Sequence, residues 1–120
     1  MKRIWLGLFL ILFAGCEVIG PERGEVIGTV RSSSIVLSNR TGAPVYYFVV
    51  GRATVTVILW APYVSEENEI PSGRSVEIAV KDIPGGENET EVIAYWWHAR
   101  QEGGELRAGE IQYIVLALKG

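Results

Sequence analysis

Short runs of β-branched and aromatic residues, divided by glycine, proline and asparagine at regular intervals, constrain this chain more than any other feature. Such runs predict β-strands, and the dividing residues predict tight turns. No stretch shows a sustained 3.6-residue apolar period with capping residues, the pattern typical of a helix packed on a core. The sequence therefore predicts an all-β domain, with strands at residues 25–31, 34–39, 45–50, 53–60, 75–81, 90–99 and 110–119.

Alternating side chains predict which face of a strand points inward. In residues 75–81, apolar and mostly polar positions alternate, so Val76, Ile78 and Val80 are predicted core residues. The sequence of residues 90–99 is apolar on both faces, as expected of a central strand covered on each side.

Gly51-Arg52 lies between two apolar runs and suits a two-residue hairpin, because glycine accepts the positive φ of the first turn position. The hairpin would pair residues 45–50 with residues 53–60. This pairing divides the side chains into two sets, one on each face. The set that contains no threonine would then form the core face. This prediction puts Tyr46, Phe48, Val55 and Val57 inward, and Tyr47, Val49, Thr54, Thr56 and Trp60 outward.

About seven short antiparallel strands in roughly 95 residues fit a β-sandwich of immunoglobulin-like architecture. A small closed β-barrel is the alternative. Parallel α/β folds are excluded by the missing helices.

The first sixteen residues, MKRIWLGLFLILFAGC, have the layout of a secretory signal: a basic start, an apolar run and small residues before a cysteine. The apolar run of about ten residues would reach about 15 Å as a helix, half of a bilayer core. Its last four residues, Phe13-Ala14-Gly15-Cys16, resemble the lipobox of bacterial lipoproteins, with phenylalanine where that motif prefers leucine. The resemblance implies a diacylated Cys16 and removal of the preceding peptide; a plain signal peptide is the alternative.

The sequence thus divides into a signal peptide at residues 1–15, a lipidated cysteine with a short tether at residues 16–24, and a single domain at residues 25–120. Cys16 is the only cysteine, so it has no disulfide partner within the chain, which agrees with lipidation. In diderm lipoproteins an aspartate after the cysteine often marks inner-membrane retention. Glu17 stands here instead, which weakly favours the outer membrane.

The mature chain is acidic, because nine basic residues remain against fourteen acidic ones, a net charge of −5. No cluster of lysine or arginine is present. These features argue against nucleic-acid binding and against electrostatic adhesion to anionic lipid. The acyl chains on Cys16 are therefore expected to hold the protein to the membrane.

Tyr95-Trp96-Trp97-His98 is the densest aromatic stretch. Consecutive strand residues point to opposite faces, so one tryptophan is expected inside and one outside. The sequence favours Trp97 as the inner residue. The outer one predicts a binding patch, with candidate residues Trp96, Trp60, Tyr47 and His98. The other interpretation, which the sequence favours, is that both tryptophans are core residues of a central hairpin.

The sequence offers no catalytic constellation. His98 is the only histidine and Asp82 the only aspartate, and no Gly-x-Ser-x-Gly motif is present. A metal site needs more ligands than one histidine, and the acidic residues 65–69 lack the spacing of an EF-hand loop. We therefore expect no enzyme, no cofactor and no metal.

Three functions remain in order of preference. The first is a membrane-anchored, non-enzymatic module that binds or scaffolds another envelope protein. The second is a carbohydrate- or cell-wall-binding module that uses exposed aromatics. The third is a small inhibitor of secreted hydrolases. A row of coplanar exposed aromatics would favour a glycan, whereas a flat apolar patch or a bare edge strand would favour a protein partner.

Overall fold

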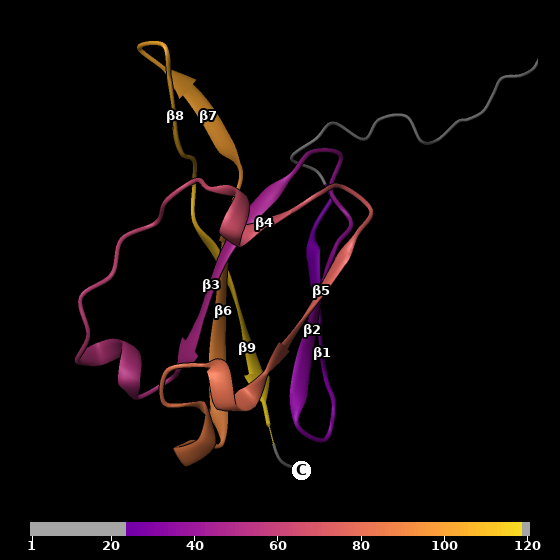
Figure 1. The fold of residues 1–120 in the computed structure, drawn as a ribbon, viewed down its shortest axis with the longest axis vertical. Helices are drawn as coiled ribbons and strands as arrows, with labels where there is room; N and C mark the ends of the chain where they lie inside the picture. Colours follow the sequence, from indigo (N-terminus) through magenta and orange to yellow (C-terminus); the bar gives the residue numbers. More distant parts are fainter. Residues whose placement is uncertain (1–23, 119–120) are drawn as a thin grey trace, which may run out of the picture.

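The computed structural model describes residues 24–118, and these contain strands and short 3-10 turns but no α-helix (Figure 1). The predicted signal peptide, Cys16 and most of the tether lie outside the described residues. The strands are β1 (Val26–Val30), β2 (Ser34–Asn39), β3 (Val45–Gly51), β4 (Glu69–Ile70), β5 (Ser75–Ala79), β6 (Glu91–Trp97), β7 (Ala99–Glu102), β8 (Glu105–Ala108) and β9 (Gln112–Ala117). The 3-10 turns are η4 (Thr54–Thr56), η5 (Glu66–Asn68), η6 (Val80–Asp82) and η7 (Gly86–Asn88).

Seven strands form two antiparallel sheets. One has the order β1-β2-β5 and the other the order β4-β3-β6-β9. Figure 1 shows them edge-on, with β3, β6 and β9 on the left and β1, β2 and β5 on the right. The all-β, immunoglobulin-like sandwich predicted from the sequence is confirmed, and the sheets do not close into a barrel.

The core lies between the two sheets. The first sheet contributes Ile35 and Leu37 from β2, and Val76 and Ile78 of β5 pack against them as predicted. Val80, also predicted to be a core strand residue, begins the turn η6 instead. The four-stranded sheet contributes the buried side chains Val45, Val49, Ile70, Val92, Ala94, Trp96 and Leu116.

The predicted strand at residues 53–60 does not form. β3 pairs with β6 instead, and the chain after Gly51 continues as η4 and then as a loop that covers the outer face of the sheet. Gly51 is not among the described glycines with positive φ, so the predicted type II′ turn is absent. The carboxylate of Glu89 explains the change, because it accepts hydrogen bonds from the amides of Ala53 and Thr54 that a hairpin would have used elsewhere. We call residues 52–68 the β3–β4 loop.

The facing predicted for β3 is also wrong. Val45 and Val49 are core residues and Tyr47 packs against them, whereas Phe48 contacts Trp60 on the outer face. The prediction used the threonines of residues 53–60 as the mark of the outer side. Since that strand does not exist, its threonines carry no information about β3.

A small hairpin interrupts the connection between β6 and β9. β7 and β8 pair through the two-residue turn Gly103-Gly104, and both glycines have positive φ (61° and 83°). Glycine adopts such conformations without strain, and two consecutive positive φ values fit a type I′ turn. The hairpin projects from one end of the sandwich in Figure 1. The sequence did not predict its strands, because they are short and half of their residues are charged.

Candidate functional site

Both tryptophans of the aromatic stretch are buried, but on the faces opposite to those predicted. Trp96 is 8% exposed and belongs to the core between the sheets. Trp97 is 0% exposed and lies on the outer face of β6, where its Nε1–H donates to the carbonyl oxygen of Tyr63 at 3.0 Å. The β3–β4 loop therefore turns an outer strand face into a second buried layer.

Three of the four residues predicted to form a binding patch lie together on the core side of the four-stranded sheet, because Tyr47 is opposite Trp96 in the β3–β6 ladder and the Trp96 ring contacts that of His98. Tyr47 packs against the core that contains Trp96, so neither is presented to a partner. Trp60 lies on the outer face of the four-stranded sheet. His98 follows β6, and its Nε2 is 3.1 Å from the hydroxyl of Thr41. The sheet therefore separates Trp60 from the other three predicted residues.

Trp60 is the centre of an aromatic cluster on the outer face. Its ring centroid is 4.8 Å from those of Phe48 and Tyr95 and 6.1 Å from that of Trp97. Tyr95 in turn contacts Tyr113 of β9 at 6.2 Å. The interplanar angles run from 29° to 54°, and Trp60 is half-buried. These rings hold the loop on the sheet and do not form the coplanar exposed row expected of a glycan platform.

The free edge of the four-stranded sheet is the first candidate site. β9 is the last strand, and within the described chain β6 is its only partner in the sheet. Tyr113 is 66% exposed, and Ile111 and Val115 are also exposed. We call Ile111, Tyr113 and Val115, together with the open main-chain groups beside them, the β9 surface.

The hydrogen-bond register shows which main-chain groups of β9 are open. The amide of Leu118 donates to the carbonyl of Thr90 at 2.7 Å, in register with the pairs Leu116–Val92 and Ile114–Ala94. In an antiparallel ladder only alternate residues bond to a given neighbour. The N–H and C=O groups of Tyr113 and Val115 therefore point away from β6, toward the free edge.

Two of the other three sheet edges are better protected than β9, whereas β1 is also an uncharged edge strand. β4 has only two residues, and β5 carries the exposed Glu77, with Arg74 before it and Lys81 after it. Short edges and charged side chains are common ways to prevent unwanted strand pairing. Residues 111–118 contain no charge, no proline and no glycine. β9 thus has the composition of a strand that can pair with a further strand.

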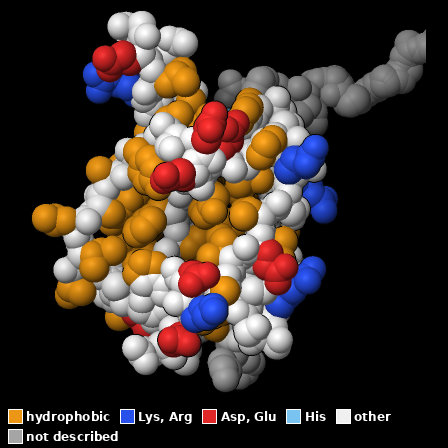
Figure 2. All heavy atoms as spheres, in the orientation of Figure 1, with side chains coloured by type: hydrophobic (Ala, Val, Ile, Leu, Met, Phe, Trp, Pro, Cys, Tyr) orange, Lys and Arg blue, Asp and Glu red, His pale blue; other side chains and the backbone are white. Residues whose placement is uncertain are grey.

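The β3–β4 loop is a second exposed apolar surface. Val57 is 81% exposed, Leu59 is fully exposed and Tyr63 is half-exposed. In Figure 2 hydrophobic side chains gather along the left margin of the molecule, where this loop runs in Figure 1. The sequence signal was present, since residues 55–64 contain no charged residue, but it was interpreted as part of a strand.

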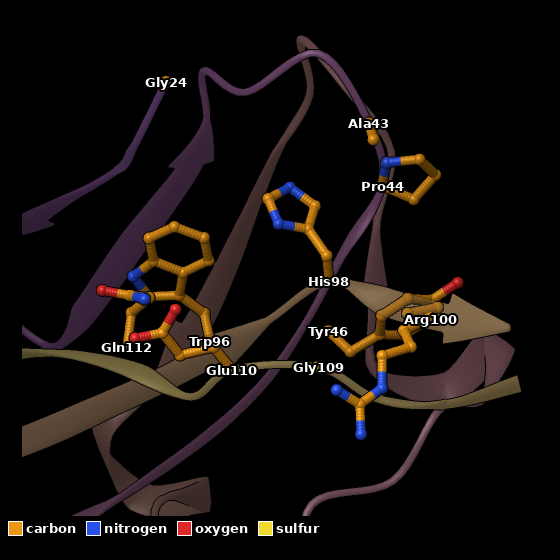
Figure 3. A pocket seen from close by; sticks show the side chains of 11 residues that line it. Gly24, Ala43, Pro44, Tyr46, Trp96, His98, Arg100, Gly109, Glu110 and Gln112 are labelled. Carbon is orange, nitrogen blue, oxygen red and sulfur yellow. The ribbon is translucent and has the colours of Figure 1, made fainter. Parts of the chain in front are cut away.

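A cleft of about 590 Å³ lies at the base of the β7–β8 hairpin (Figure 3). The Trp96 and His98 rings meet edge to face at 5.8 Å, so His98 covers the indole instead of leaving it open. The Arg100 side chain points away from these two rings in Figure 3. Its guanidinium is 3.6 Å from the Glu102 carboxylate, with which it forms an ion pair. Its lining residues are Gly24, Ala43, Pro44, Tyr46, Trp96, His98, Ala99, Arg100, Gly109, Glu110 and Gln112.

The shifted pKa values have structural causes. Burial raises the pKa of Tyr47, and the nearby Tyr63 raises it further. Burial, with the charge of Glu69, raises the pKa of Tyr46. The Thr54 hydroxyl, followed by the Ala53 amide, lowers the pKa of the Glu89 carboxyl by hydrogen bonding.

No known protein family, curated protein or solved structure matches the chain. Within residues 24–118, no group of three or more His, Cys, Asp or Glu side chains is placed to hold a metal ion. The same residues include no helix that is long and apolar enough to cross a bilayer.

Proposed function

We propose that this protein is a membrane-anchored extracytoplasmic lipoprotein whose sandwich docks another envelope protein and catalyses no reaction. The anchor rests on the lipobox-like ending at Cys16. The single observation that carries the docking role is the β9 surface, an uncharged edge strand with exposed apolar side chains.

Strand addition is the mode of binding that this surface supports. An extended segment of the partner would form main-chain hydrogen bonds with Tyr113 and Val115. It would accept from their N–H groups and donate to their C=O groups. Each such hydrogen bond contributes about 0.5–1.5 kcal/mol net. The side chains of the same two residues project on the outer face and would add apolar contact. Main-chain bonds provide affinity, and the exposed side chains provide specificity.

The carbohydrate-binding alternative has less support. Trp96 and Trp97 are buried, and the half-buried Trp60 is stacked on Phe48. Tyr113 remains the exposed aromatic on β9, and its ring is tilted by 54° from that of Tyr95. Stacking on a sugar needs an open ring face. A bare apolar edge favours a protein partner.

Val115→Pro tests strand addition, because proline removes the open N–H and leaves the bonds between β9 and β6 in place. Val115→Thr is the matched control, since threonine has nearly the same shape and keeps the N–H. Lipidated protein with either substitution would be used to capture partners from envelope membranes. We expect the wild type and Val115→Thr to recover the same protein, and Val115→Pro to lose most of it. Equal recovery by all three folded proteins would contradict strand addition at β9.

A further inference from the structure

The apolar tip of the β3–β4 loop is fixed in an outward position by contacts at both ends. At its start, the Glu89 carboxylate binds the amide and hydroxyl of Thr54. At its end, the side chain of Asn68 donates to the Tyr63 carbonyl at 3.0 Å. Trp60 packs on the sheet between these two points. These contacts hold the loop in place, so its tip stays exposed to solvent.

The tip alternates between inward and outward side chains. Ile58 and Trp60 are half-buried, whereas Val57 and Leu59 point into solvent. Exposed aliphatic side chains at a loop tip are costly in water unless something covers them. Tyr63 lies half-exposed beside them, and tyrosine and tryptophan are enriched where proteins meet the bilayer interface.

The exposed apolar area of the tip indicates whether its partner is a membrane or a protein. Val57, Leu59 and Tyr63 together expose on the order of 400 Å² of apolar surface, about half of what one side of a stable protein interface requires. Insertion into a bilayer has no such threshold when another anchor already holds the molecule at the surface. The area therefore favours a lipid surface.

The chain between Cys16 and the sandwich limits how far the domain can move from the membrane. Eight residues separate Cys16 from Glu25 and span at most about 26 Å when extended. This distance is smaller than the longest dimension of the described molecule, 65 Å. A domain held so closely meets the bilayer at a high effective concentration.

We propose that the tip formed by Val57, Leu59 and Tyr63 inserts into the interfacial region of the bilayer to which the protein is anchored. The inference rests on the proposed lipid anchor at Cys16. Insertion is driven by apolar burial, because residues 55–64 are uncharged and the residues that follow include Glu66 and Glu67. It should therefore occur with zwitterionic lipid and resist added salt.

A fluorescent label at position 59 tests the insertion. In mature lipidated protein the sulfur of Cys16 is occupied, so Leu59→Cys supplies a single free thiol for an environment-sensitive dye such as NBD. Glu102→Cys, on the exposed hairpin, is the matched control. In phosphatidylcholine vesicles we expect the label at 59 to shift to the blue and to be quenched several-fold more by doxyl lipids than the label at 102. Adding Val57→Asp to the protein labelled at position 59 should remove much of its blue shift and of its extra quenching.

The outcomes separate the two proposals. Protein that floats with the vesicles while the label at 59 behaves like the label at 102 overturns the insertion and leaves the anchor intact. Protein that does not float overturns the anchor and the insertion together. A label that is exposed in vesicles but shielded in native envelope membranes assigns the tip to a protein partner and also overturns the proposal.

Discussion

Trp96 and Trp97 are adjacent residues that stabilise two different layers. Trp96 fills space between the sheets, and Trp97 is enclosed by the β3–β4 loop through its bond to Tyr63. Removing either side chain would leave a large cavity. We expect Trp96→Ala and Trp97→Ala each to lower the free energy of unfolding by about 3–5 kcal/mol.

Trp97→Phe should cost less than Trp97→Ala, because the phenyl ring keeps part of the packing. The lost Nε1–H bond contributes about 1 kcal/mol of its cost, and the Tyr63 carbonyl keeps its bond from Asn68. Urea denaturation of the three variants measures all of these values. Near-wild-type stability of Trp96→Ala would show that Trp96 is not between the sheets.

At the scale of the element, Glu89 fixes where the β3–β4 loop begins. Its folded-state pKa lies below the unfolded value of 4.5, because the Thr54 hydroxyl and the Ala53 amide stabilise its ionised form. The stabilisation is therefore fully present above pH 4.5 and is lost as the pH falls through the folded-state pKa. We expect Glu89→Gln to be less stable than the wild type at pH 7, and the difference in stability to shrink as the pH falls below 4.5. Urea unfolding at pH 7 and across the acidic range tests this, and a difference that is independent of pH would refute the role of the charge.

The sequence predicted most strands because their alternation and turn residues are local signals. β2 was predicted at its observed limits, and β1, β3, β5, β6 and β9 within a few residues. Residues 53–60 were wrongly predicted because a β-rich composition there is overruled by a distant carboxylate, Glu89, and by the packing of Trp60. Local patterns contain no information about such long-range contacts.

The candidate surfaces were harder to predict than the fold. The apolar character of residues 111–118 was visible, but whether that strand lies at a sheet edge depends on the order of all the strands. The choice of Trp96 as the exposed tryptophan failed for a related reason, since the facing of β6 depends on its register with β3. An exposed site is a property of the assembled sheet.

At the scale of the whole molecule, Cys16 is the proposed point of attachment to the membrane. Cys16→Ser removes the sulfur that carries the lipid. We therefore expect incorporation of a fatty-acid analogue to fall to background, and the signal peptide to remain uncleaved at that site. Metabolic labelling and the mass of the protein measure both effects. Full labelling of the serine variant would exclude a lipid anchor at residue 16.

The docking role of β9 is tested most directly by photocrosslinking in intact cells. A photoreactive amino acid replaces Tyr113 on β9 in one protein and Glu77 on β5 in another, and both positions are exposed. The account predicts one prominent covalent adduct with another envelope protein from position 113, and little or none from position 77. The absence of a protein adduct at position 113, or equal adducts at both positions, would contradict docking at the β9 surface.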